Sequence, residues 1–249
     1  MSDHVIVERR GAVQVIRMNR PDKKNAITRA MYATMAEALA GGDADAAVRV
    51  HVILGTPGAF SSGNDLADFM AVAMGGDGGT EVYDFLVALA RAGKPIVSGV
   101  DGIAVGIGTT INLHCDVTLA TPRTVFRTPF VDLGLVPEAG SSLLAPAVLG
   151  RQRAFALLGI GEGFSAEEAM AAGLIREVVA EGDLEAKTLQ VAETIASKPP
   201  EALKIARDLM LGDREALVAR IREEGAHFRA RLKSDEARTA FMAFMSRKK

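Results

Sequence analysis

The chain of 249 residues lacks several features that would indicate particular classes of protein. Its one cysteine, Cys115, leaves no partner for an intrachain disulfide, which is typical of a protein in a reducing compartment. It has no tryptophan and two tyrosines, so we expect no aromatic-rich recognition surface. The net charge is −2, with acidic and basic residues mixed along the chain. We therefore expect no concentrated basic surface that could bind nucleic acid.

Motifs of several common active sites are also missing. The four histidines, His4, His51, His114 and His227, have no metal-binding spacing, so we expect no metal site. The glycine-rich loop with lysine that binds phosphate, the GxGxxG fingerprint of dinucleotide-binding folds and the GxSxG turn of serine hydrolases are absent.

No apolar run is long enough to span a bilayer. The best candidate, near Ile103–Leu113, is short and interrupted by glycine. Met1–His4 lacks the apolar stretch of a secretory signal, and Ser246–Lys249 is not a peroxisomal signal. We therefore expect a cytoplasmic protein without a membrane partner.

Strand and helix patterns alternate along the chain until about residue 180, where helices alone begin. The pattern predicts strands near 5–9, 12–18, 50–55, 95–100, 116–120, 124–126 and 174–179, and helices near 28–45, 80–91, 141–149, 151–158 and 166–171. Four further helices are expected at about 184–196, 200–211, 214–231 and 235–246. Such alternation predicts an α/β fold with parallel strands and crossovers.

The all-helical C-terminal part has apolar faces that need a surface to cover. We place a boundary between a core of residues 1–195 and a helical region of residues 196–249. Those faces either fold back on the core of the same chain or cover a neighbouring subunit, and the sequence leaves both alternatives open.

Two glycine-containing turns follow apolar strands, at Ala59–Asp65 and at Gly102–Gly108. Glycine permits close backbone approach, and the start of a following helix leaves N–H groups without partners. One N–H from each turn can converge on an oxygen that becomes negative during a reaction, and such an oxyanion hole contributes ~3–4 kcal/mol per donor. The alternative is that the glycines only allow tight turns.

Glu138 is the most suggestive candidate for proton transfer. It lies within Val125–Ser142 and follows a run rich in apolar residues. Burial in apolar surroundings raises the pKa of a carboxyl group and suits it to exchange protons near neutral pH. The alternative is a solvated turn or helix-start residue.

Together, the motifs around these positions resemble those of the crotonase superfamily, the enoyl-CoA hydratase/isomerase group, over nearly the whole chain. They are Asn19-Arg20-Pro21 with Asn25-Ala26, Phe60–Leu66, Lys94–Val97 with Gly102–Gly106, Cys115-Asp116, Thr128–Phe130, Leu133–Pro137, Gly150, Ser165–Ala169 and Gly173-Leu174. The resemblance implies a crotonase-like spiral of ββα units, with C-terminal helices that build a homotrimer or a dimer of trimers (a hexamer).

The resemblance further implies an acyl-CoA thioester substrate, and no cofactor beyond the coenzyme A that is part of it. It places the oxyanion-hole N–H donors at Asn64 and Ile107. Residues expected near the substrate and its CoA are Lys24, Ala26, Ser62, Gly63, Asp65, Leu66 and Phe130. A phosphate contact from Lys23 or Lys24 has the alternative of a solvated loop lysine.

The catalytic positions depart from the hydratase pattern. The two glutamates of hydratases fall on Thr110 and Phe130, and neither of these can act as a carboxylate. The stretch around Glu138 resembles instead the Δ3,Δ2-enoyl-CoA isomerases, in which a single glutamate at this position does the chemistry. Phe130 either helps to keep the pocket dry or is simply a core residue.

Three hypotheses for the function therefore stand: an enoyl-CoA isomerase that uses Glu138; a hydratase, or another crotonase-type enzyme, with one glutamate; and a non-catalytic acyl-CoA-binding subunit. Ala71–Gly79 and the helix after it are expected to set the depth of the acyl pocket. Asp132 is expected to be structural or ion-paired.

Overall fold

Two β-sheets form the framework of the protein. The computed structural model describes residues 2–68, 76 and 79–246. The larger sheet has the order β1 (Val5–Arg10), β2 (Val13–Met18), β3 (Val50–Leu54), β5 (Ile96–Val100), β7 (Val117–Ala120) and β10 (Glu177–Val178). The smaller has the order β4 (Ala59–Ser61), β6 (Ile103–Val105), β8 (Val125–Arg127) and β9 (Phe164–Ser165). Neighbouring strands are parallel except in the β1–β2 and β8–β9 pairs.

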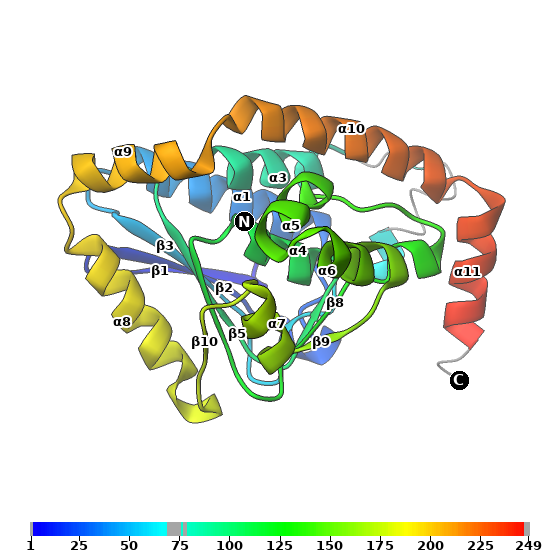
Figure 1. Ribbon diagram of the computed structural model, residues 1–249, viewed down its shortest axis with the longest axis horizontal. Coiled ribbons are helices and arrows are strands. Elements are labelled where there is room, and N and C mark those ends of the chain that lie inside the picture. The colour runs from blue at the N-terminus through cyan, green and yellow to red at the C-terminus, as the bar shows by residue number, and fades with distance from the viewer. Residues whose placement is uncertain (1, 69–75, 77–78, 247–249) are drawn as a thin grey trace.

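Helices surround these sheets (Figure 1). The α-helices are α1 (Arg29–Ala44), α3 (Glu81–Arg91), α4 (Ile107–Thr110), α5 (Ser141–Leu149), α6 (Arg151–Phe155), α7 (Ala166–Ala172), α8 (Leu184–Ala196), α9 (Pro200–Leu211), α10 (Arg214–Leu232) and α11 (Asp235–Ser246). Short 3₁₀ turns are η1 (Pro21–Lys23), η2 (Ile111–His114), η3 (Val131–Leu133) and η5 (Glu181–Asp183), and η4 (Ala156–Ile160) is a π-helical turn.

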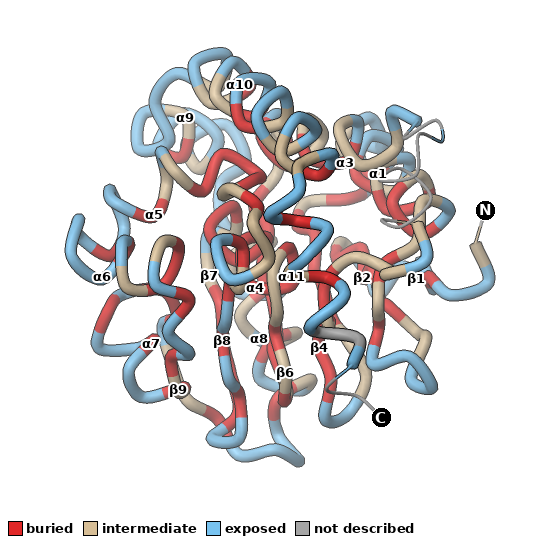
Figure 2. The backbone as a smooth tube through the Cα atoms, turned by 90° about the vertical axis from the view of Figure 1, so that its right-hand side faces the viewer, coloured by how far each residue is buried: buried red, intermediate tan, exposed pale blue. Residues whose placement is uncertain are grey.

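The central strands β3 and β5 of the larger sheet are buried on both faces, which explains their apolar character. In β3 all five residues are buried. Because successive side chains point to opposite faces, Val50 and Val52 pack in a cluster with Leu184 and Ala192 of α8, while Ile53 joins the main core. Figure 2 shows this buried interior running between the sheets and the helices.

Most of the elements expected from the sequence are present, but the smaller sheet was only partly foreseen. The segments predicted as turns at Ala59–Asp65 and Gly102–Gly108 each contain a three-residue strand, β4 and β6. A strand this short has too few residues for an alternating pattern, and it exists because β4 and β6 pair with each other across the fold. The expected strand at 174–179 is limited to β10.

Part of the helical C-terminal region folds back on its own chain. Val218 and Ile221 of α10 are buried in the main core, and α10 packs along α3 (Figure 1). In α9, by contrast, Ile205 and Leu209 are exposed. The boundary at 195/196 and the oligomeric state stay predictions. Within residues 2–68 and 79–246, no helix combines the length and the apolar character needed to cross a membrane.

Candidate active site

A pocket lies between α1, α3, α10 and the turn that carries Glu138. Its empty space is about 930 Å³, part of it open to solvent. Apolar and aromatic side chains provide most of the wall. Six of the lining residues are Tyr32, Asn64, Leu86, Glu138, Ile221 and Phe228. The pocket therefore contains the acid singled out in the sequence and one of the two predicted oxyanion donors.

Glu138 is the buried acid of this pocket. Only 7% of the surface of this residue is exposed. Burial raises the pKa of its carboxyl group to about 8; a hydrogen bond from Thr110 opposes this shift, and the negative charge of Glu224 adds to it. The Thr110 hydroxyl donates to Oε1 of Glu138 over 2.6 Å. Glu138 is thus not a solvated turn residue, and a pKa this close to neutral suits its carboxyl group to proton exchange.

The turn after Glu138 has an unusual backbone. Ala139 and Gly140 are both left-handed, with φ of 61° and 69°. A left-handed non-glycine residue costs roughly 1–2 kcal/mol, so the surrounding structure must hold it. His114 does so by donating from Nε2 to the Ala139 carbonyl over 2.7 Å, because a carbonyl can only accept. Burial lowers the pKa of His114 to about 4, so this imidazole is neutral near pH 7.

The two glycine turns lie against each other. Since β4 and β6 pair in parallel, their carboxyl ends carry Asn64 and Ile107 to the same edge of the smaller sheet. A Cβ atom on Gly63, which has φ of +96°, would lie 3.1 Å from the Val105 carbonyl oxygen. A Cβ on Gly108 would lie 2.7 Å from the carbonyl oxygen of Ser61. Glycine is therefore required here for the approach of two backbone segments, and not only for turning.

The predicted donors, the amide N–H groups of Asn64 and Ile107, are both available. Among the residues that the structure describes, neither N–H donates a hydrogen bond. Ile107 is the first residue of α4, where an N–H has no partner within the helix. Asn64 lines the pocket, whereas Ile107 is fully buried beside the Gly63 turn and does not line it.

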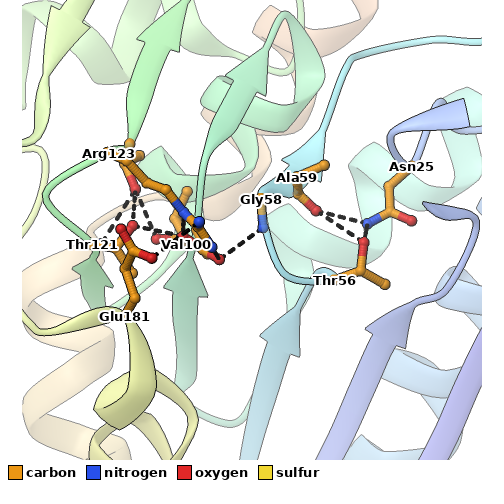
Figure 3. A network of polar contacts seen from close by, with 10 residues as sticks. Asn25, Thr56, Gly58, Ala59, Val100, Thr121, Arg123 and Glu181 are labelled. Carbon is orange, nitrogen blue, oxygen red and sulfur yellow. Dashed lines mark hydrogen bonds and ion pairs between the residues drawn. The ribbon is translucent and has the colours of Figure 1, made fainter.

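A polar network holds the opposite ends of β4 and β6 together (Figure 3). Asp101, just before β6, accepts hydrogen bonds from the Gly58 amide, 2.8 Å, and the Thr121 hydroxyl, 2.7 Å, and pairs with Arg123. Burial alone would raise the pKa of Asp101, but these contacts lower it to about 2. On the other side, the Asn25 amide donates to the Ala59 carbonyl over 2.8 Å. The relative position of the two strands, and so of the two donors, is fixed by charged and hydrogen-bonded groups.

The residues expected to bind CoA fall into two groups, one held by polar contacts and one apolar. Lys24 is exposed, and its carbonyl accepts the Ser62 amide N–H over 2.9 Å, which joins the two segments. The Asp65 carboxylate is engaged by Arg20 at 2.6 Å, and Arg20 also donates to the Ala26 carbonyl over 3.0 Å. Asp65 therefore positions the predicted CoA-binding segments rather than offering a free carboxylate.

The remaining predicted contacts are apolar. Leu66 is partly buried against the main core. Phe130 is 5% exposed, is part of the core and does not line the pocket, which favours the interpretation of a core residue. A Cβ on Gly106 would lie 3.9 Å from its ring, so Phe130 backs the second glycine turn. As expected, Asp132 is ion-paired, with Arg127 at 3.1 Å.

Tyr32 is a functional candidate that no sequence pattern predicted. Tyr32 is fully buried, lines the pocket and donates to the side-chain oxygen of Asn64 over 2.5 Å; burial, and next the charges of Glu138 and Asp68, raise its pKa well above 10. The segment 71–79 lies outside the described residues apart from Gly76 and Gly79. The helix after it, α3, contributes Val82, Tyr83 and Leu86 to the pocket, and its role in setting the pocket depth stays a prediction.

Comparison with known proteins agrees with this architecture. The family model described as enoyl-CoA hydratase/isomerase matches residues 8–249. The chain is 41% identical to the structure of Pseudomonas aeruginosa OdaA, with a TM-score of 0.93, covering 98% of this chain and 99% of that one. This likeness confirms the expected α/β fold of the crotonase type.

Two curated relatives carry different names. Enoyl-CoA delta isomerase 2 of Rattus norvegicus is 36% identical over 99% of this chain, which spans 64% of the length of that relative. A probable enoyl-CoA hydratase of Rhizobium meliloti (strain 1021) is 30% identical over 98% of this chain and 96% of its own. With its fold, its pocket and these matches, the chain belongs to the enoyl-CoA hydratase/isomerase family.

Proposed function

We propose that the protein is a Δ3,Δ2-enoyl-CoA isomerase, which moves the double bond of a 3-enoyl-CoA thioester to the 2,3 position. The observation that carries this proposal is the Glu138 carboxyl group, buried in the pocket with a pKa of about 8 and held by one hydrogen bond. A single base that can take and return a proton is sufficient for this reaction. The name of the rat relative points the same way.

In the proposed mechanism, Glu138 removes a proton from Cα of the 3-enoyl thioester. The electron pair moves onto the thioester oxygen, which becomes an enolate oxygen stabilised by the N–H groups of Asn64 and Ile107. Protonated Glu138 then returns the proton to Cγ, so the double bond ends in conjugation with the thioester. No water takes part, and the apolar wall favours this course by excluding it.

The composition of the pocket supports an isomerase over a hydratase. Hydration asks for two carboxylates, and the positions that supply them in hydratases hold Thr110 and Phe130. Asp68 also lines the pocket, but its carboxylate accepts the Arg29 amide N–H over 2.9 Å at the start of α1. Glu138 is therefore the acid that we assign to proton transfer.

Paired substrates separate the three hypotheses. Incubation with a 3-enoyl-CoA should produce the 2-enoyl thioester, and the ultraviolet absorbance of this conjugated product reports its formation. Incubation with a 2-enoyl-CoA should yield little 3-hydroxyacyl product. Predominant hydration of the 2-enoyl substrate would instead identify a single-glutamate hydratase. Tight binding of both thioesters without turnover would identify an acyl-CoA-binding subunit.

A further inference from the structure

Helix α10 supplies a second buried carboxylate, Glu224, behind the turn that carries Glu138. Glu224 is 6% exposed. It accepts hydrogen bonds from the Gly140 amide at 2.6 Å, the Ser142 amide at 2.9 Å and the Ser142 hydroxyl at 2.5 Å. Three donors therefore converge on one carboxyl group, an arrangement that suits an ionised carboxylate.

These contacts cap α5 from a distant part of the chain. The N-cap residue of α5 is Gly140, which has no side chain with which to satisfy the first amide groups of the helix. Glu224 takes over that function, and its negative charge is favourable at a helix N-terminus. Helix α10 also packs closely on the turn, because a Cβ on Gly140 would lie 2.4 Å from Leu217.

The capped turn is the one that aims Glu138 into the pocket. Glu138 is separated from Gly140 by left-handed Ala139 alone, and its own carbonyl accepts the Ser141 amide over 3.1 Å. Displacement of Gly140 would therefore move Glu138 directly. Since a misplacement of about 1 Å can cost about 100-fold in rate, the hold on this turn matters to the reaction.

We propose that Glu224 is the positioning residue for Glu138: its carboxylate anchors the turn at residues 138–142 by accepting hydrogen bonds from Gly140 and Ser142. The inference rests on the proposed role of Glu138 as the base. Glu224 itself does not line the pocket. The anchored turn holds the Glu138 carboxyl group in place for both proton transfers, and the neighbouring negative charge makes ionised Glu138 a stronger base toward Cα.

The charges around Glu138 agree with this assignment. Burial is the main cause of its raised pKa, and the charge of Glu224 raises it further. From α1, Tyr32 faces it as a neutral hydroxyl, and His114 of η2 is neutral near pH 7. The other charged groups of the pocket are Arg29, Asp68 and Arg229. Among these groups, Glu224 is the one whose charge contributes to the shift at Glu138.

The test is a titration of Glu138 in the substrate-free protein. Glutamate labelled with ¹³C at the carboxyl carbon is followed by NMR, with the Glu138 signal assigned from its absence in Glu138→Gln. Glu224→Gln removes one charge from the site and should lower the pKa of Glu138. Glu215→Gln removes the same charge from the exposed start of α10 and should leave it unchanged. An unchanged titration of Glu138 in folded Glu224→Gln overturns the inference.

A pair of serine variants tests the anchoring separately. Ser142→Ala deletes one donor to Glu224 and keeps the charge, so kcat should fall by about 3- to 10-fold, as for a hydrogen bond of about 1 kcal/mol, while KM stays close to that of the native enzyme. The neighbouring hydroxyl of Ser141 is buried without a partner among the described residues, so Ser141→Ala should leave kcat unchanged. Equal kcat values for the two variants overturn the anchoring role. Because the titration needs no substrate, failure of the isomerase assignment would be recognised independently.

Discussion

The Thr110 hydroxyl donates a 2.6 Å hydrogen bond to one oxygen of the Glu138 carboxyl group, Oε1. No hydrogen bond to the other oxygen, Oε2, occurs within the described part of the chain. One oxygen is thus held and the other is left for proton transfer. The resemblance to hydratases places Thr110 at a position where they have a glutamate, so a residue that hydrogen-bonds to Glu138 occupies the expected position of a second acid.

Thr110→Val should shift the pH dependence of activity upwards. The hydrogen bond from Thr110 lowers the pKa of Glu138 against the larger effect of burial, so its loss leaves that pKa higher. A base acts only when ionised, so kcat/KM of the native enzyme should rise with pH and level off above about pH 8. In Thr110→Val the plateau should be reached at higher pH, with about tenfold lower activity at pH 7.

Thr110→Ser is the control, because it retains the hydroxyl. It should keep a pH–rate profile close to that of the native enzyme. If Thr110→Val and Thr110→Ser share one profile, the hydrogen bond does not govern the ionisation of Glu138.

Gly63→Ala should reduce kcat by about 10- to 100-fold, since a displaced donor forfeits much of the stabilisation of the oxyanion. A Cβ at this position would lie 3.1 Å from the Val105 carbonyl and force apart the two turns that carry Asn64 and Ile107. Gly11→Ala is a matched control: this glycine is also left-handed, with φ of +60°, but an added Cβ meets nothing within 4 Å. Steady-state kinetics with a 3-enoyl-CoA measure both, and equal kcat values would contradict this role of Gly63.

Asp65→Ala should weaken substrate binding more than chemistry. The Arg20–Asp65 pair, 2.6 Å apart with both side chains about 85% buried, joins the segments that contain Ala26 and Ser62. Loss of the Asp65 carboxylate leaves the charge of Arg20 partly buried without this partner, which should destabilise the fold by about 1–3 kcal/mol in urea unfolding. The same change should raise KM with little change in kcat. Glu215→Ala breaks the exposed pair with Arg91 and should change neither. A fall in kcat at constant KM would contradict a role of Asp65 in binding.

The burial of Glu138 should make the stability of the fold depend on pH. Its pKa is about 8 in the folded protein against a usual value of 4.5, so between these values the folded state binds more protons than the unfolded state. Stability should therefore fall as pH rises from about 4.5 to 8, by about 1.4 kcal/mol per unit of pKa difference and so by a few kcal/mol in all.

Glu138→Gln isolates this contribution, because Gln does not ionise. The difference in unfolding free energy between the native enzyme and the variant, from urea titrations at several pH values, should grow in favour of the variant as pH rises. A difference that is constant from pH 5 to 8 would show that the Glu138 carboxyl does not titrate in this range.

Local patterns predicted most helices and the strands of the larger sheet, because burial on both faces leaves a long apolar signature in β3 and capping residues mark helix starts. Thr28, for example, stands at the start of the helix predicted near 28–45 and accepts the Met31 amide over 3.3 Å. The short strands β4 and β6 left no such signature, since their stability comes from pairing with each other.

The candidate site likewise contains residues that the sequence predicted and residues that it did not. Glu138 and the two glycine turns were predicted because glycine and an acid in apolar surroundings are visible in the sequence. Glu224 was not, because it lies 84 residues from the Gly140 amide that it caps and occurs on a helix rich in surface charge. Nor does any local pattern distinguish Tyr32 from other core residues of α1, since its partner Asn64 is 32 residues away.

The role of Glu138 as the base is tested by the rate of double-bond migration in Glu138→Gln, measured with a 3-enoyl-CoA beside the native enzyme. The substitution keeps the size of the side chain and removes its ability to take a proton. We expect a loss of about 100- to 10,000-fold in kcat, with the thioester still bound. A kcat within a few-fold of the native value would contradict the assignment of Glu138 as the base.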